Sequence, residues 1–150
     1  MHRHDGNPHA IQPHEGCPTP AEYANLRHAL GFGRLSPEEA ERTLSASRYA
    51  LCLRAGGELA GVLRILGDGL LYLFIADVFV HPDHAGRGLG TTLMEAAVAY
   101  IGANAHPLAT VTLVPMAGRE PFYERFGFVR CPNQVFGAGM AYLRHLELEG

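Results

Sequence analysis

The sequence predicts a single α/β (α+β) domain built on a mixed β-sheet, and three observations lead to this fold class. The 150 residues fit one domain, and no linker divides them. Hydrophobic residues make up 47% of the chain and charged residues 18%, which is typical of a folded, soluble protein. Helix and strand patterns follow one another in the order ααβββαβαββ, as expected for a mixed sheet with helices beside it.

The first segment, residues 1–19, is predicted to be a flexible, solvated N-terminal tail. It contains four of the nine histidines: His2, His4, His9 and His14. No regular element organises these side chains, so a metal site is the weaker interpretation and we expect no bound metal. The predicted domain covers residues 20–150.

Two short helices open this domain. Thr19, with Glu22 three residues later, forms a capping box that predicts a helix over Pro20–Leu30. A glycine-containing loop ends this helix. Ser36 begins a second capping box and predicts a helix that ends near Ser45.

Three strand patterns follow the helices. They cover Tyr49–Arg54, Leu59–Leu66 and Leu71–Val80, and two glycine-containing turns, Ala55–Gly57 and Gly67–Gly69, separate them. The third pattern is the most apolar. We therefore expect this strand to be central and to be covered on both faces of the sheet.

Further elements complete the predicted chain. Apolar residues recur on one side of Gly88–Ala103, which predicts a helix. The remaining patterns predict a strand at Leu108–Val114, a helix at Arg119–Phe126 that Gly127 ends, and strands at Phe128–Arg130 and Met140–Leu148.

Composition excludes several functional classes. All twelve basic residues are arginines, which excludes a Schiff-base lysine and the lysine of a Walker A loop. With a net charge of −3, the composition gives no hint of a basic face for nucleic acid. The longest uncharged apolar stretch, Gly69–Ala76, is far shorter than the roughly 20 residues of a membrane-spanning helix. We expect neither nucleic acid nor a membrane as a partner.

The three cysteines give no sign of a disulfide framework. Their number is odd, and no two form a C-x-x-C pair that could hold zinc. The N-terminus also lacks the apolar run of a signal peptide. A cytoplasmic location is the resulting expectation.

The segment from Val78 to Thr91 has the strongest functional pattern. A predicted strand ends at His81, glycines then alternate at Gly86, Gly88 and Gly90, and a helix begins at once. Such glycines let backbone N–H groups converge, and a helix N-terminus adds about half a positive charge. The spacing differs from the G-x-G-x-x-G of dinucleotide loops. The pattern predicts a diphosphate site without lysine. The alternative is a glycine-rich turn without a ligand.

A second motif follows the next predicted strand and reads Pro121-Phe122-Tyr123-Glu124-Arg125-Phe126-Gly127-Phe128. Together with the glycine loop, in this order and spacing, it resembles the GNAT superfamily of N-acetyltransferases. The resemblance covers about Pro20 to Leu146 and implies a mixed, mostly antiparallel sheet flanked by helices. That sheet would splay into a V between Leu71–Val80 and Leu108–Val114.

The resemblance implies acetyl-CoA as co-substrate. Its pantetheine arm would pair with the main chain of Val78, Phe79 and Val80 inside the V. Its diphosphate would lie on the loop, whose residues are Ala85, Gly86, Arg87, Gly88, Leu89, Gly90 and Thr91. Ala85 departs from the family pattern, because the family usually has Gln or Arg there.

The resemblance also implies candidate catalytic residues. Tyr123 would contact the cofactor and protonate the departing thiolate, unless it is only a packed aromatic. Several relatives have a Glu or His at the position of Ala76 that can act as the general base, and alanine cannot fill that role. Asp77, the only acidic residue in the central strand, is then the first candidate for the general base. The alternative is that Asp77 holds local backbone or an arginine. His81 is a weaker candidate.

The acceptor site would be lined by aromatic residues: Phe32, Tyr72, Phe74 and Phe136. Few charges accompany them, which suits a small amine with an apolar body. Two other functions stay open: acetylation of a protein N-terminus or lysine, and a non-catalytic regulator that binds acyl-CoA. The resemblance also includes a homodimer through a C-terminal strand edge as one option.

Overall fold

The computed structural model of the chain describes residues 10–144. The chain divides after Leu113 into two compact units. The N-terminal unit contains the β-sheet and three of the helices, and the described part of the C-terminal unit contains one short helix together with turns and irregular chain.

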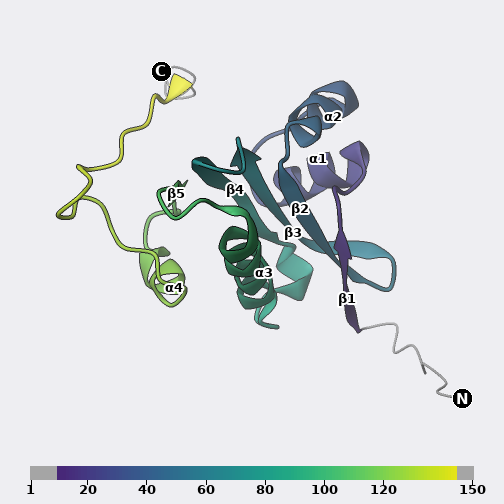
Figure 1. Ribbon diagram of the computed structural model, residues 1–150. Coiled ribbons are helices and arrows are strands. Elements are labelled where there is room, and N and C mark those ends of the chain that lie inside the picture. Colours follow the sequence, from purple (N-terminus) through teal and green to yellow (C-terminus); the bar gives the residue numbers. More distant parts are fainter. Residues whose placement is uncertain (1–9, 145–150) are drawn as a thin grey trace, which may run out of the picture. The chain divides into compact units, whose positions relative to one another are not determined.

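A five-stranded sheet forms the N-terminal unit (Figure 1). Its strands lie in sequence order: β1 (Ile11–Glu15), β2 (Tyr49–Ala55), β3 (Glu58–Gly67), β4 (Tyr72–Val80) and β5 (Thr110–Leu113). The first four strands are antiparallel neighbours, and β5 pairs with β4 in parallel. The predicted mixed, mostly antiparallel sheet with flanking helices is confirmed.

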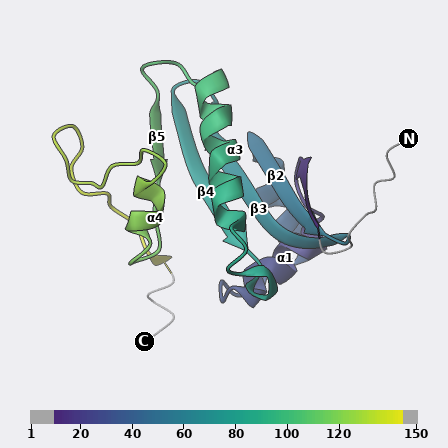
Figure 2. The ribbon, with the colours of Figure 1, turned by 90° about the horizontal axis from the view of Figure 1, so that it is seen from below.

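The helices cover both faces of this sheet (Figures 1 and 2). Helices α1 (Pro20–Ala29) and α2 (Pro37–Ser45) lie on one face, and α3 (Leu89–Asn104) lies on the other. Both predicted capping boxes form, since Thr19 and Ser36 each accept the backbone N–H three residues later.

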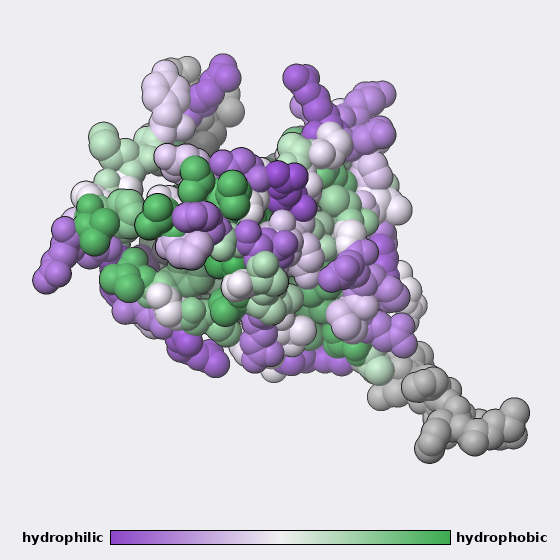
Figure 3. Space-filling view, in the orientation of Figure 1, coloured by the Kyte–Doolittle hydropathy of each residue, from purple (hydrophilic) through white to green (hydrophobic). Residues whose placement is uncertain are grey.

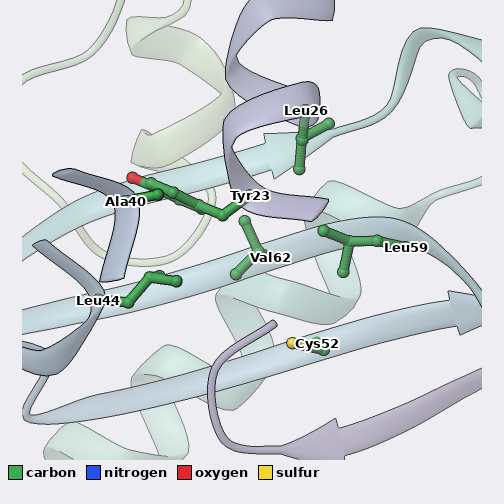
Figure 4. Packing of buried hydrophobic residues seen from close by; sticks show 7 residues of the cluster. All are labelled: Tyr23, Leu26, Ala40, Leu44, Cys52, Leu59 and Val62. Atoms are coloured by element: carbon green, nitrogen blue, oxygen red, sulfur yellow. The ribbon is translucent and has the colours of Figure 1, made fainter. Parts of the chain in front are cut away.

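Neighbouring residues of β3 show the two-sided packing. A Cβ added to Gly61 would lie 3.5 Å from Leu93 of α3. The next residue, Val62, packs with Tyr23, Leu26 and other side chains of the α1–α2 side. Figure 4 shows this cluster, which also contains Ala40, Leu44, Cys52 and Leu59. The alternation follows from the two-residue period of a strand.

Strand β4 contains a β-bulge at Ala76. Arg64 of β3 lies opposite Asp77, whereas the next residue, Ile65, lies opposite Ile75. Ala76 is therefore an extra residue on β4. A bulge bends a strand and increases its local twist, so the two halves of β4 run in different directions.

The prediction of a flexible N-terminal tail is wrong for Ile11–Glu15. Ile11–Glu15 pairs antiparallel with β2, from Ile11 opposite Ala55 to Glu15 opposite Leu51. Its sequence contains Pro13 and no alternation of apolar residues, so no strand pattern is visible. The free edge of β2 supplies the ladder, and an edge strand tolerates proline. Residues 1–9 of the tail lie outside the described residues.

The expectation that β4 is covered on both faces is also wrong. Tyr72 is 65% exposed and Phe74 is 37% exposed, whereas Leu73 and Ile75 are buried. The first half of this apolar run is therefore a strand with one buried face and one face of exposed aromatic side chains. The β4–β5 strand pair and the helix between them (α3) agree with the sequence prediction.

The C-terminal unit contains helix α4 (Glu120–Glu124), which agrees with the predicted short helix. Gly127 after it has φ of 92°, the predicted left-handed conformation. The predicted closing strands are wrong: residues 128–130 and 140–144 have no strand, and 145–148 lie outside the described residues. A strand needs a neighbour for its ladder, and residues 114–144 offer none. Hydrophobic side chains of this segment reach the surface (Figure 3), among them Val129, Val135, Met140 and Tyr142.

Candidate functional site

The free edge of β4 is the first part of the candidate site. Pairing with β5 ends where Ile75 meets Leu113, but β4 continues to Val80. Among residues 10–144, no strand pairs with this side of Ala76–Val80. A strand edge presents backbone N–H and C=O groups that need partners. An extended ligand with amide groups can therefore bind here as an added strand.

The glycine loop continues directly from this edge. A single 3-10 turn, η1 (Pro82–His84), links β4 to the loop, and His81 Nδ1 accepts the backbone N–H of Asp83. Gly86 and Gly88 have φ of 77° and 76°, which only glycine adopts without strain. A Cβ at either glycine would meet nothing within 4 Å, so the space in front of the loop is open.

Helix α3 begins at this loop with Gly88 as N-cap and has no side-chain capping hydrogen bond. The first N–H groups of a helix have no partner inside the helix, and they lie at its positive end. Beside them, Arg87 Nη1 lies 3.0 Å from His84 Nδ1. Uncapped backbone donors together with an arginine favour a phosphate-bearing ligand.

Asp77 lies in a buried hydrogen-bond network and is 4% exposed. Its Oδ2 accepts the hydroxyl of Tyr23 and the Nε–H of Arg64, each at 2.6 Å. Arg64 also donates to the Thr43 carbonyl at 2.8 Å and to the Ser47 hydroxyl at 3.0 Å. Burial, and then the charge of Asp77, raise the pKa of the Tyr23 phenol, which therefore stays protonated and donates.

This geometry supports the structural interpretation of Asp77. Both donors bind one carboxylate oxygen, and the pair ties β4 at its bulge to β3, α1 and α2. Sequence reasoning offered an arginine partner for Asp77 as one alternative but did not identify Arg64, and it missed Tyr23. The available signal was a lone arginine inside the apolar run of β3, since a charge in a buried strand needs an opposite charge.

The predicted acceptor residues lie in different places. Phe32, between α1 and α2, stacks on Phe79 of β4 with ring centroids 5.2 Å apart, and it is 40% exposed. Tyr72 and Phe74 lie exposed on the half of β4 that pairs with β5. The structure therefore brings Phe32 to the half of β4 that has the free edge.

Tyr123 and Phe136 belong to the C-terminal unit. Tyr123 lies on α4, where its ring makes an edge contact with Phe122 at 5.0 Å. Burial raises the pKa of its phenol, so the hydroxyl is protonated at neutral pH. Phe136 is 47% exposed and lies in a turn that Asn133 Oδ1 holds by accepting two backbone N–H groups.

Comparison with known proteins places the chain in a family. The model of the acetyltransferase (GNAT) domain matches residues 19–145. The chain belongs to the GNAT acetyltransferase family. This confirms the family that the two sequence motifs suggested, and members of this family are N-acetyltransferases that generally use acetyl-CoA.

Relatives of this GNAT chain include two proteins that are described as N-acetyltransferases. It is 31% identical over 119 residues to serotonin N-acetyltransferase 2, chloroplastic, of Oryza sativa subsp. japonica, covering 77% of the chain and 58% of the relative. It is 30% identical to an uncharacterized N-acetyltransferase of Pyropia yezoensis, covering 55% of the chain and 47% of the relative. The chain thus spans about half the length of the curated relatives it matches.

Solved structures agree with the GNAT fold. A probable acetyltransferase from meticillin-resistant Staphylococcus aureus is 26% identical and has a TM-score of 0.78, covering 89% of this chain and all of that one, 100%. A structure from Deinococcus radiodurans, described as a putative acetyltransferase, is 26% identical with a TM-score of 0.70, covering 91% of this chain and 90% of that one. Within residues 10–144, no helix is both long and apolar enough to cross a membrane.

Proposed function

We propose that this GNAT-family protein transfers the acetyl group of acetyl-CoA to the amine of a small molecule. One observation supports it above all: the free edge of β4, the glycine loop and the uncapped start of α3 form one continuous segment. Such a segment offers amide partners at one end and anion donors at the other. A ligand with an amide-containing arm and a diphosphate has this same order of groups.

The cofactor-binding residues follow from that segment. The main chain of Val78, Phe79 and Val80 would pair with the pantetheine arm, because this part of β4 lacks a strand on one side. The diphosphate would take the backbone donors of the loop and first turn, from Ala85 and Gly86 through Arg87, Gly88, Leu89 and Gly90 to Thr91. The residue at 85 matters little in this arrangement, since the donors belong to the main chain.

The chemistry is attack of the neutral amine on the thioester carbonyl, which forms the C–N bond and breaks the C–S bond. Tyr123 would give its phenolic proton to the departing thiolate, and its raised pKa keeps that proton in place until then. A primary amine of pKa about 10.4 is neutral in about one molecule per thousand near pH 7.4, a cost of about 4 kcal/mol. Because Asp77 already accepts two hydrogen bonds, we propose that water takes the amine proton.

The acceptor class rests on the exposed aromatic residues. Phe32, Tyr72 and Phe74 are exposed aromatic residues of the N-terminal unit, and Phe136 is an exposed aromatic residue of the C-terminal unit. Aromatic faces favour an apolar or aromatic body. A relative whose name gives serotonin as its acceptor is consistent with this class.

The test combines cofactor binding with turnover. Calorimetry with CoA should show binding, and thiol release from acetyl-CoA should rise with arylalkylamines such as tryptamine. Gly88→Asp should abolish CoA binding, because it places a carboxylate where the diphosphate would lie. Gly88→Ala is the matched control, since it adds the same strain at φ of 76° without a charge.

Each outcome decides the proposal. CoA binding that survives Gly88→Asp would refute the loop assignment. CoA binding without acetyl transfer to any amine would favour the regulator over the enzyme. Acetyl transfer to peptides but not to small amines would show that the acceptor is a peptide and not a small amine.

A further inference from the structure

We infer that Arg27 is the binding site for a carboxylate on the acceptor, so that the favoured substrate is an amine that also bears a carboxylate. This inference rests on the proposed function and specifies its acceptor. Arg27 lies in the last turn of α1, and its guanidinium stands among three aromatic rings. The guanidinium carbon lies 5.3 Å from the ring centre of Phe32 and 5.9 Å from those of Tyr23 and Phe79.

The rings leave one donor of Arg27 without a partner, although the Arg27 side chain also forms a hydrogen bond with Tyr23. Cation–π contacts use the face of a guanidinium, whereas its five N–H donors lie in its plane. The Nε–H of Arg27 is buried and has no hydrogen-bond partner among residues 10–144. Nor does Arg27 form an ion pair with any of those residues. A buried donor without a partner is costly, which indicates that a ligand supplies the acceptor.

Arg64 makes the contrast clear. It too lies near the Tyr23 ring, with its guanidinium carbon 5.1 Å from the ring centre. Its donors, however, are taken by Asp77, the Thr43 carbonyl and the Ser47 hydroxyl. Of two arginines beside one tyrosine, Arg64 has protein acceptors for its Nε–H and for both Nη groups, whereas Arg27 has none for its Nε–H.

The location of Arg27 fits an acceptor site. Its ring partner Phe79 lies in the half of β4 that has the free edge, three residues beyond the bulge at Ala76. At about 3.3 Å per residue, this distance along the strand is about 10 Å. Arg27 as a whole is half-buried and the stacked ring of Phe32 is 40% exposed, so the cluster borders on solvent. Planar guanidinium is suited to a carboxylate because it can donate two parallel hydrogen bonds.

The experiment uses pairs of probes that differ only in the carboxylate. These are phenylalanine and phenylethylamine, tryptophan and tryptamine, and leucine and isopentylamine. Calorimetry measures the affinity of each probe for the full chain, with and without CoA. In at least one pair, the acid should bind about 10- to 100-fold tighter, the range of a charge-assisted hydrogen bond.

Two variants test whether Arg27 causes this preference. Arg27→Met keeps an unbranched apolar side chain and should abolish the preference, leaving affinity for the decarboxylated probe within about threefold. Arg42→Met is the matched control, because Arg42 lies in the last turn of α2 and is exposed. It should retain the preference. Far-UV circular dichroism checks that both variants fold.

The outcomes separate this inference from the proposed function. The inference is overturned if no pair shows tighter binding of the acid, or if Arg27→Met keeps the preference. Acetyl transfer to the decarboxylated amines would leave the proposed function intact in either case. Absence of both CoA binding and acetyl transfer would instead refute the proposed function.

Discussion

Replacing Asp77 by asparagine should destabilise the protein far more than it changes the chemistry. The substitution keeps the shape and one acceptor oxygen but removes the charge that faces Arg64 at 2.6 Å. Both side chains are 4% exposed, so solvent cannot compensate for the loss. Breaking a buried ion pair by removing one partner costs about 3–5 kcal/mol. For a domain of this size, that corresponds to a fall in Tm of about 6–20 °C.

Thermal and urea unfolding of three variants would measure the effect. Asp77→Asn should lower the free energy of unfolding by the amount above. Asp83→Asn is the matched control, because the Asp83 side chain is 85% exposed, and it should change stability little. Adding Arg64→Met to Asp77→Asn should recover much of the loss, since it removes the unpaired buried charge.

The same variant distinguishes a structural aspartate from a general base. If Asp77 were the general base, the Asp77→Asn enzyme would have normal stability, low turnover and a changed pH profile. A free energy of unfolding within about 1 kcal/mol of wild type would refute the ion-pair reasoning. Reduced turnover in a variant of unchanged stability would indicate that Asp77 acts in the reaction.

Two further predictions concern Tyr123 and Glu22. Tyr123→Phe should lower turnover by about 10²-fold or more while the KM for acetyl-CoA moves little, if the phenol protonates the thiolate. Turnover within a few-fold of wild type would assign Tyr123 to packing. The Arg54 guanidinium, bound to Glu22, lowers the pKa of that carboxyl from 4.5 to about 2, so its stabilising effect is complete above pH 4.5 and is lost as the pH falls towards 2. Glu22→Gln should flatten the acid limb of a stability–pH curve, and an unchanged slope would contradict this linkage.

Local signals in the sequence predicted much of the fold. The capping boxes at Thr19 and Ser36 depend only on residues three apart, so they form as predicted. The glycine loop is equally local, because positive φ at Gly86 and Gly88 is a property of those residues. The third strand pattern was correct in extent but not in exposure. An apolar run does not say which of its side chains the rest of the protein covers.

Partners distant in sequence decided the remaining features. Ile11–Glu15 becomes a strand because β2 offers an edge, and residues 128–130 and 140–144 are not strands because their unit offers none. The bulge at Ala76 depends on how β3 and β4 pair, which no single strand encodes.

The sequence by itself determined the family of this protein and the conformation of its glycine loop, because both depend on short motifs. Only the tertiary structure decided what its charged residues do. Asp77 and Arg64 are 13 residues apart, and Tyr23 is 54 residues from Asp77, yet they share one carboxylate oxygen in the interior. Arg27 has its rings from Phe32 and Phe79 but no carboxylate beside it among the described residues. The role of a charge depends on which groups surround it after folding, and chain proximity does not reveal them.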